Sequence, residues 1–355
     1  MPVSQDQVLE ALKAVEDPDL HRDIVALGFV KDVEIEGDSV SFKVELTTPA
    51  CPVKELLQQQ CHEAVIALEG VASVAVEMTA RVWPSSPDRA DRIPEVKQCI
   101  AIASGKGGVG KSTVAVNLAV ALAEQGAKVG LLDADVYGPS IPMMMGTEGE
   151  KPLAQDSKIV PIERYGIRMM SMGFLLEEGQ AVMWRGPMVA ATVKQLLDDV
   201  IWGELDYLLV DLPPGTGDAP MSLAQLVPLT GVVIVTTPHS VAANIAGKAA
   251  QLFQKLEAPL LGVVENMGQF VCPSCHEEFR LFNGTRGDEL AKRLGIPYLG
   301  SIPLDPAISQ SSDDGRPAIM EHPDTPQAAA FRSVAGRLAA EASILTVKKT
   351  EEATA

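Results

Sequence analysis

The feature that most constrains the fold of this chain is a glycine-rich stretch at residues 104–113, Ser-Gly-Lys-Gly-Gly-Val-Gly-Lys-Ser-Thr. The apolar run before it, residues 99–103, predicts a buried strand, and residues 114–123 after it predict a helix. Between a strand and a helix, the spacing Gly105-x4-Gly110-Lys111-Ser112 is typical of a phosphate-binding loop, or P-loop. In such a loop backbone N–H groups converge on phosphate oxygens, and the helix start adds partial positive charge. We therefore expect a nucleotide site inside an α/β domain.

Each position of this loop has an expected role in holding ATP and Mg²⁺. Lys111 would reach the β- and γ-phosphates, and the Ser112 hydroxyl would bind Mg²⁺. A glycine-rich turn that binds nothing is the alternative, and the flanking strand and helix weigh against it. The residues expected to contact the nucleotide are Gly105, Lys106, Gly107, Gly108, Val109, Gly110, Lys111, Ser112 and Thr113.

A second lysine, Lys106, lies inside the loop, where an ordinary P-loop does not need one. The pattern Lys-Gly-Gly-x-Gly-Lys-Ser resembles the deviant Walker A class of NTPases, which includes MinD, ParA and the nitrogenase iron protein. The resemblance implies that Lys106 reaches across a dimer to the partner's nucleotide and takes part in catalysis. A solvated loop lysine is the other interpretation.

Carboxylates follow two further predicted strands. The apolar run 128–132 ends in Asp133 and Asp135, separated by one alanine, and the run 205–210 leads into Asp211. Ligands bind at the carboxyl ends of strands in open α/β sheets, so we expect these side chains beside the phosphates. Asp135 is our candidate for positioning the attacking water, Asp133 is expected near the Mg²⁺ shell, and Asp211 would hold Mg²⁺ through water. Two solvated turn residues are the alternative for Asp133 and Asp135.

An asparagine at the end of another predicted strand is a candidate for binding the base. Asn266 follows the apolar run 261–264, and its amide can present both a donor and an acceptor to an adenine edge. The NTPases that this chain resembles use such an asparagine for the base. A buried asparagine that caps a loop is the alternative.

Cys272 and Cys275 form a Cys-x-x-Cys pair, which suits a redox thiol pair or half of a four-cysteine metal site. The chain has no second Cys-x-x-Cys. A symmetric dimer would supply one, because a two-fold interface brings the same surface of both subunits together. Four thiolates then fit a cubane iron–sulfur cluster or Zn²⁺. The adjacent His276 is interpreted as a solvated loop residue, with a metal ligand as the alternative.

A small α+β domain is predicted over residues 1–83. Helical and alternating patterns indicate, in order, a helix at 4–16, a hairpin of strands at 29–35 and 40–46, a helix at 52–68 and a strand at 71–77. Cys51 lies at the start of the second helix, where the helix dipole would stabilise a thiolate. We therefore treat Cys51 as a candidate accessory thiol, with a small buried residue as an alternative of nearly equal weight.

The rest of the chain is organised around the P-loop. Residues 84–96, rich in proline, serine and charge, are expected to be a flexible linker. Residues 97–345 are assigned to the P-loop ATPase domain, and the polar residues 346–355 to a disordered tail. Strands and helices alternate through this domain, which predicts a mostly parallel sheet with helices on both faces.

Composition limits the classes of partner. The 355 residues carry a formal net charge of −18, which argues against a basic surface that grips nucleic acid. No uninterrupted apolar stretch approaches the ~20 residues of a membrane span, and no signal peptide is recognisable at the N-terminus. Five cysteines, an odd number, do not indicate a secreted disulfide framework. We expect a cytoplasmic protein with neither nucleic-acid nor membrane partners.

Two family resemblances cover most of the chain. The P-loop at 105–112, the stretches 133–140, 184–188 and 211–218, and the Cys272–Cys275 pair resemble the Mrp/ApbC family of ATP-dependent iron–sulfur cluster carriers. This resemblance runs over residues 97–345. Residues 16–20, 24–30 and 47–52 resemble the MIP18-like domain linked to iron–sulfur assembly, over residues 5–83.

The resemblance implies a homodimer that holds a [4Fe–4S] cluster between Cys272 and Cys275 of each subunit. It also implies that ATP binding or hydrolysis alters the dimer, and that the cluster passes intact to apo-proteins. Cluster-assembly scaffolds are further implied partners. Two other classes stay open, a MinD- or ParA-like positioning ATPase and a zinc-bridged nucleotide-binding scaffold.

Overall fold

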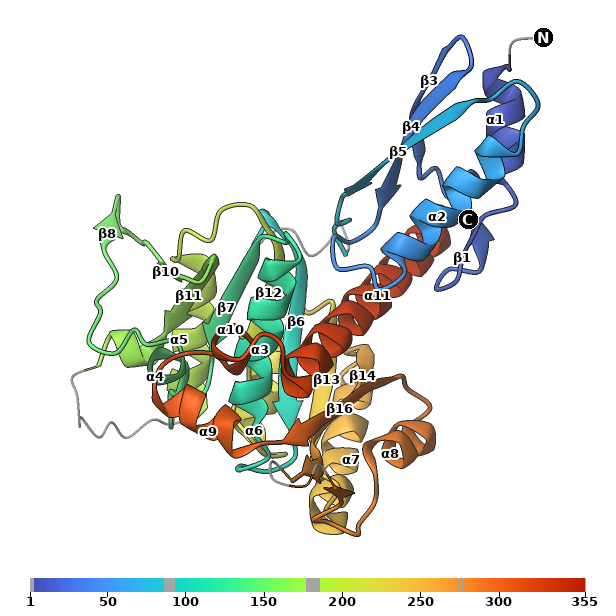
Figure 1. Cartoon of the computed structure of the whole chain (residues 1–355). Helices are drawn as coiled ribbons and strands as arrows, with labels where there is room; N and C mark the ends of the chain where they lie inside the picture. The colour runs from blue at the N-terminus through green and yellow to red at the C-terminus, as the bar shows by residue number, and fades with distance from the viewer. Residues whose placement is uncertain (1–2, 86–92, 177–185, 273–274, 276, 355) are drawn as a thin grey trace. The chain divides into compact units, whose positions relative to one another are not determined.

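The computed structural model describes residues 3–85, 93–176, 186–272, 275 and 277–354. The chain forms two compact units, coloured by residue number in Figure 1. Unit 1 comprises residues 1–83 and 343–355, and unit 2 comprises residues 84–342. Most of the predicted linker, residues 86–92, lies outside the described part of the chain. None of the described helices is long and apolar enough to cross a membrane.

Unit 1 combines two helices with a three-stranded sheet, as the sequence pattern predicts. Ser4 begins the first helix with a capping box, because its side chain accepts from Gln7 N while the Gln7 side chain accepts from Ser4 N. The elements are α1 (Gln5–Leu12), β1 (Glu16–Asp17), β2 (Arg22–Asp23), β3 (Val30–Glu36), β4 (Ser39–Leu46), α2 (Lys54–Ile66) and β5 (Ser73–Ala80). In the sheet β3 and β4 pair antiparallel, and β5 joins β4 in parallel.

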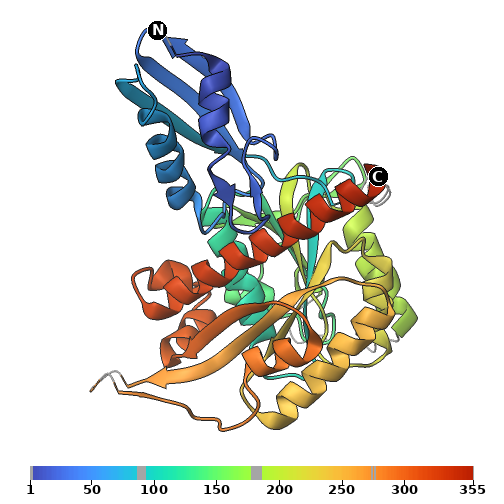
Figure 2. The ribbon, with the colours of Figure 1, turned by 90° about the vertical axis from the view of Figure 1, so that its right-hand side faces the viewer.

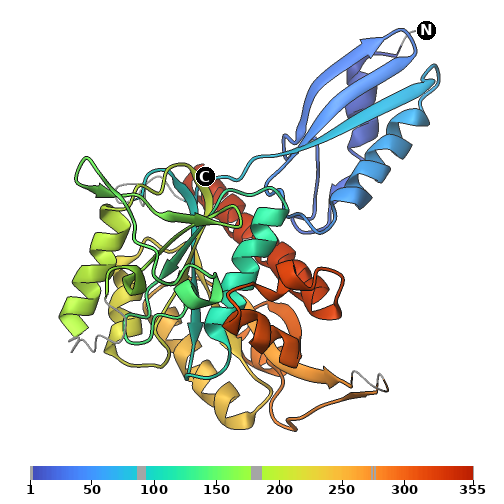
Figure 3. The same ribbon diagram turned by 60° about the vertical axis from the view of Figure 1, so that its left-hand side comes forward.

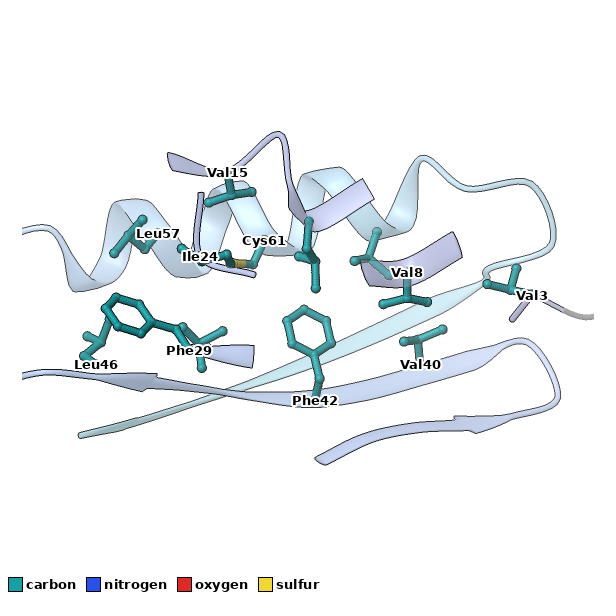
Figure 4. Packing of buried hydrophobic residues seen from close by; sticks show 13 residues of the cluster. Val3, Val8, Val15, Ile24, Phe29, Val40, Phe42, Leu46, Leu57 and Cys61 are labelled. Atoms are coloured by element: carbon teal, nitrogen blue, oxygen red, sulfur yellow. The ribbon is translucent and has the colours of Figure 1, made fainter. Parts of the chain in front are cut away.

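The core of unit 1 lies between β4 and the two helices (Figure 4). Every second side chain of β4 is buried, including Val40 and Phe42, because one face of this strand meets the helices. Val8 of α1 and Leu57 and Cys61 of α2 pack against that face. Burial of each large apolar side chain stabilises the fold by about 1.5–3 kcal/mol. Cys61 is therefore a core residue.

Unit 2 is built around a nine-stranded, mostly parallel sheet, which confirms the predicted fold class. The strand order is β10-β11-β7-β12-β6-β13-β14-β15, with β16 paired to β14. Only the pairs β10–β11 and β14–β15 in this sheet are antiparallel. The strands of unit 2 are β6 (Val96–Ser104), β7 (Val129–Asp133), β8 (Ala154–Gln155), β9 (Lys158–Ile159), β10 (Ile162–Arg164), β11 (Ile167–Ser171), β12 (Leu205–Asp211), β13 (Gly231–Thr236), β14 (Leu260–Val271), β15 (Glu278–Phe279) and β16 (Tyr298–Leu304).

Helices cover both faces of this sheet, with α3 on one side and α5 and α7 on the other (Figure 2). The central strands β6 and β12 are accordingly buried along most of their length, as expected for a parallel sheet covered on both faces. The helices are α3 (Lys111–Glu124), α4 (Ile141–Met144), α5 (Gly186–Asp198), α6 (Asp218–Leu226), α7 (Ser240–Lys255), α8 (Gly287–Leu294), α9 (Pro306–Asp313), α10 (Ala318–Glu321) and α11 (Pro326–Thr354), with a short 3₁₀ turn at Met172–Phe174.

The last helix corrects one prediction. The helix α11 continues to Thr354, so the disordered tail expected for residues 346–355 is wrong for all its described residues. Thr346 and Val347 are 1% and 7% exposed, and Val347 lines a groove of unit 1 together with Leu20 and Leu27. The polar composition of this segment was the ground for expecting disorder, whereas in the structure its side chains pack within unit 1.

Candidate functional site

The P-loop connects β6 to α3 at the carboxyl end of the central strands, as predicted. Gly108 and Gly110 have φ of +78° and +77°, a left-handed conformation that residues with side chains rarely adopt. A Cβ at Gly105 would lie 2.5 Å from the backbone nitrogen of Ala246 in α7. The left-handed backbone therefore favours glycine at 108 and 110, and the close approach of α7 requires glycine at 105.

A buried ion pair lies at the centre of the site. Lys111 Nζ lies 2.5 Å from Asp211 Oδ1, and the Ser112 hydroxyl donates to Asp211 Oδ2 at 2.6 Å. The side chains of Lys111 and Asp211 are 6% and 0% exposed. The structure thus brings together three of the residues that the sequence assigns to the phosphates and Mg²⁺.

The oxygen atoms of this cluster fit a Mg²⁺ ion. In nucleotide sites Mg²⁺ is held by one or two protein oxygens, substrate phosphates and water, and Ser112 and Asp211 supply such oxygens. Gly107 and Gly108 leave open space at the loop, since the nearest atom to a Cβ at Gly107 is Pro214 Cγ at 4.0 Å. Lys111 would exchange Asp211 for phosphate oxygens on binding, and its amine would then neutralise the nucleotide.

Asp133, at the end of β7, is held by three donors. Its Oδ1 accepts from the backbone nitrogen of Asp135 at 3.1 Å, and its Oδ2 accepts from Ile141 N at 3.3 Å. The Ser171 hydroxyl donates to Oδ2 at 2.9 Å. Burial, and after it the charge of Asp211, raises the pKa of Asp133 to about 7. Asp133 therefore anchors the loop that carries Asp135, and a role near Mg²⁺ stays a prediction.

Asp135 lies two residues beyond β7 and is half-buried. Burial raises the pKa of its carboxyl, and the positive charge of Lys111 acts in the opposite direction. Asp133 and Asp211 are paired in the register of the neighbouring parallel strands β7 and β12. The chain that continues from β7 to Asp135 therefore leaves the sheet beside the Lys111–Asp211 ion pair. This location is compatible with the predicted positioning of water by Asp135.

Lys106 lies in the first part of the P-loop and is half-buried. The Ser104 hydroxyl donates to the Lys106 carbonyl at 3.0 Å, which fixes the loop backbone at this point. The loop after β12 is attached to the same place, because Gly215 N donates to the Ser104 carbonyl at 3.0 Å. A role of the Lys106 ammonium toward a partner subunit stays a prediction.

Asn266 lies within β14 and contacts the P-loop. Its side-chain nitrogen donates to the Val109 carbonyl at 2.9 Å, and its residue surface is 6% exposed. A Cβ at Gly110 would overlap this amide nitrogen, so strand and loop are closely packed. The predicted contact with the base stays a prediction, and the observed contact matches the alternative of a buried asparagine that caps a loop, the loop here being the P-loop.

The thiol pair follows β14 directly. Cys272 is half-buried and Cys275 is exposed, and the Cys272 backbone nitrogen donates to the Glu277 carbonyl at 3.0 Å. Figures 2 and 3 show the ends of β14 and β15 extending beyond the body of unit 2. Over the described residues, no three His, Cys, Asp or Glu side chains gather as they would around a metal ion. His276 and the Trp184–Arg185 part of the motif at 184–188 lie outside those residues.

Cys51 does not have the environment that the sequence suggested for a reactive thiol. The helix α2 begins only at Lys54, and Cys51 lies before it. Burial raises the pKa of Cys51 to about 11, which outweighs the hydrogen bond from the Val53 backbone. Asp17 and Asp19 raise it further. The helix-start argument is therefore wrong about the direction of the pKa shift, and the accessory role stays a prediction.

Sequence reasoning missed Ser171, whose hydroxyl bonds Asp133 and accepts from Gly173 N at 3.0 Å. Ser171 ends β11, and it lies opposite Asp133 in the parallel register of β11 and β7. A serine after an apolar run carries no distinctive signal. The strand order that places it beside Asp133 is a tertiary property.

Comparison with known families shows the family of this chain. Residues 95–339 match the family model described as NUBPL iron-transfer P-loop NTPase. The chain belongs to this family. Residues 5–78 of this P-loop NTPase match a second model, described as iron–sulfur cluster assembly protein. Both matches confirm the resemblances derived from the motifs.

The relatives of this iron-transfer P-loop NTPase span nearly its whole length. It is 47% identical over 350 residues to a Deinococcus radiodurans protein named "Iron-sulfur cluster carrier protein", and the match covers 98% of each chain. A Synechocystis protein of the same name is 45% identical over 349 residues, which cover 96% of this chain and 99% of the relative.

Solved structures confirm the fold of unit 2. A nucleotide-binding protein from Archaeoglobus fulgidus in complex with ADP superposes with a TM-score of 0.60 at 42% identity, covering 69% of this chain and 96% of that one. The cell division ATPase MinD from Pyrococcus furiosus superposes with a TM-score of 0.52 at 24% identity, covering 68% and 97%. At that identity, MinD supports the fold alone.

Proposed function

We propose that this protein is an ATP-hydrolysing carrier of iron–sulfur clusters. In this proposal, Cys272 and Cys275 of two subunits hold one [4Fe–4S] cluster, which is delivered to apo-proteins. The observation that carries the proposal is that a P-loop site and a Cys-x-x-Cys pair occupy one unit, with the pair at the end of a projecting hairpin. Family membership and the printed names of the bacterial relatives support it.

The chain's own residues divide the work of hydrolysis. Lys111 binds the β- and γ-phosphates, Ser112 and Asp211 hold Mg²⁺, and the ion supplies charge neutralisation on the phosphate oxygens. Asp135 orients the attacking water. Lys106 acts on the nucleotide of the partner subunit, where a second positive charge stabilises the transition state as an arginine finger does.

The cluster is the cargo of this reaction. A cubane usually takes four thiolates, and one chain offers two at the required spacing. Two-fold symmetry supplies the other two. On delivery the Fe–S bonds to Cys272 and Cys275 break as bonds to acceptor thiols form, and the acceptor protons pass to the departing thiolates. No electron is gained or lost in this exchange.

The N-terminal domain serves delivery rather than hydrolysis. Its residues 5–78 match an iron–sulfur assembly model, while the phosphate-binding residues all lie in unit 2. Apo-proteins and assembly scaffolds are the partners that this division of work implies. Cys51 is a candidate for contact with the cargo, although burial keeps its thiol protonated at neutral pH.

Anaerobic reconstitution with iron and sulfide tests the proposal. We expect a brown protein with iron and labile sulfide in equal amounts, and transfer of cluster to an apo-acceptor. Cys272→Ala or Cys275→Ala should abolish both, while ATP hydrolysis remains. Cys61→Ala is the matched control for loss of a thiol, because Cys61 lies in the core of unit 1. Transfer that persists in the Cys272→Ala/Cys275→Ala double variant, or a colourless zinc protein, would contradict the carrier function.

A further inference from the structure

One strand connects the P-loop to the thiol pair. In the middle of β14, Asn266 donates to the Val109 carbonyl and packs on Gly110. At its end, β14 leads directly into Cys272. A displacement of the P-loop could therefore be transmitted through β14 to Cys272.

Between these two points β14 carries a bulge. Asn266 pairs with Ile302 of β16 and Phe270 pairs with Leu304, so four residue steps on β14 oppose two on β16. Within the bulge Met267 has φ of +58°. This left-handed conformation is unfavourable for a residue with a Cβ, so contacts around Met267 must hold it.

The residues on either side of Met267 are held by hydrogen bonds and close packing. Glu265 is 6% exposed, and its Oε2 accepts from Gly287 N at the start of α8 at 2.6 Å. Its Oε1 accepts from the Ser301 hydroxyl of β16 at 3.0 Å. On the other side of Met267, Gly268 packs so closely on Ser301 and Glu265 that a Cβ there would overlap the Ser301 hydroxyl.

Beyond the bulge, contacts between β14 and β15 continue as far as Cys272. The rings of Phe270 and Phe279 lie edge to face with centroids 5.1 Å apart, at a paired position of β14 and β15. The Cys272 backbone nitrogen then bonds the Glu277 carbonyl. The end of β14 and the backbone of Cys272 are thus both bonded to the segment that begins β15.

We propose that the Met267 bulge is the positioning element through which the nucleotide site sets the placement of Cys272. Phosphates bound by the P-loop shift Val109 and Gly110, Asn266 follows, and Met267 leaves its left-handed conformation as the bulge rearranges. The contacts of Glu265 and Ser301 favour the arrangement in this structure. The inference deepens the proposed function and rests on it for the purpose of the movement, because it assigns the residues that link ATP to the cluster ligands.

Met267→Gly is the first test. Glycine adopts the left-handed conformation without the penalty that a side chain brings, so this variant should favour the arrangement seen here more than the unmodified protein does. The readout is the alkylation rate of Cys272 and Cys275 in cluster-free protein, measured by peptide mass spectrometry with and without Mg²⁺ and a non-hydrolysable ATP analogue. In the unmodified protein we expect nucleotide to change the rate about fivefold or more. In Met267→Gly the change in rate caused by nucleotide should be clearly smaller, because the arrangement seen here is favoured more strongly.

Ser301→Ala should act in the opposite direction. It removes one hydrogen bond to Glu265 and the hydroxyl that packs on Gly268, so the bulge is held less firmly. We expect its nucleotide-free alkylation rate to move toward the nucleotide-bound rate of the unmodified protein. A residue that only stabilises the fold would not give opposite shifts in these two variants.

Glu257→Gly is the matched control. Glu257 also has a positive φ, +56°, and is exposed in the connection before β14. It therefore lies near the opposite end of β14 from the thiols. It should respond to nucleotide like the unmodified protein. Melting temperature and nucleotide affinity, measured on every variant, identify any that fail to fold or bind. Met267→Asn provides a second variant of the same kind, because asparagine tolerates this conformation and keeps a side chain.

Two outcomes would overturn the inference. One is an unmodified protein whose thiols do not respond to nucleotide, and the other is a folded, nucleotide-binding Met267→Gly protein that responds normally. Neither depends on the cluster, since the thiols are probed without it. Failure of the proposed function would appear separately, as reconstituted protein that takes up no iron and sulfide.

Discussion

At the scale of single residues, the two lysines of the P-loop have different surroundings. Lys111 is buried against Asp211, whereas Lys106 is half-buried. A buried charge left without its partner destabilises a protein by about 3–5 kcal/mol. Removal of the Lys111 side chain should therefore lower the free energy of unfolding, whereas removal of the Lys106 side chain should not.

Lys111→Ala should abolish ATP hydrolysis, weaken nucleotide binding and lower the melting temperature, because Asp211 loses its ion pair. Lys106→Ala should keep the melting temperature and most of the nucleotide affinity but lose turnover. Nucleotide titration, hydrolysis rate and thermal unfolding of both variants check this prediction. Equal losses of affinity in the two variants would contradict the action of Lys106 across a dimer.

Asp135→Asn should lower the hydrolysis rate by about 10²-fold or more while nucleotide affinity stays nearly unchanged, since a water-positioning carboxylate matters mainly in the transition state. Asp313→Asn, an exposed change in α9, is the control. Steady-state hydrolysis and equilibrium binding separate the two effects. An unchanged hydrolysis rate in Asp135→Asn would remove this carboxylate from the mechanism.

Cys51 should react slowly in the folded protein. Burial raises its pKa from 9.0 to about 11, so at pH 8 its thiolate fraction is about a hundredfold below that of an ordinary thiol. The folded state holds this proton more tightly than the unfolded state, so its contribution to stability is lost as pH rises from 9.0 to about 11. Iodoacetamide alkylation of Cys51, compared between native and urea-unfolded protein, checks the prediction. Equal rates at pH 8 would contradict it.

At the scale of elements, α11 contributes to both units. Its last turns, from residue 343, belong to unit 1, where Val347 is buried and Arg22 forms an ion pair with Glu351. A chain lacking residues 1–83 would expose this end of the helix while leaving the P-loop site complete.

We therefore expect the chain without residues 1–83 to hydrolyse ATP at a near-normal rate and to deliver clusters slowly. Hydrogen–deuterium exchange should show lost protection over residues 343–354, because the packing that stabilises these turns is gone. Residues 111–124 of α3 serve as the internal control. Unchanged protection at the end of α11 would mean that this segment is helical without unit 1.

At the scale of the whole molecule, the number of cluster-binding thiols in each chain predicts the oligomeric state. If four thiolates from two chains form one cubane, reconstituted protein should contain about two irons per chain and behave as a dimer. Iron analysis combined with native mass spectrometry checks this prediction. The Cys61→Ala control should keep the same ratio. Four irons on a strictly monomeric chain would exclude a cluster shared between subunits.

Local sequence determined the elements that carry chemistry. The P-loop, the strand-end carboxylates and the two domains could be read from the chain because periodicity, glycine spacing and strand–helix alternation are local properties. The match of predicted and observed strands at β6, β7 and β12 follows from their continuous apolar runs. The thiol pair could likewise be recognised from its spacing alone.

Only the tertiary structure decided what surrounds those residues. Burial reversed the expected pKa shift of Cys51, and packing in unit 1 made a helix of residues 346–354. Strand order placed Ser171 on Asp133 and Asn266 on the P-loop. Desolvation and contacts between distant segments depend on positions in space. A sequence pattern describes neighbours along the chain. It could therefore indicate candidate side chains, but not the residues that each of them contacts in the folded protein.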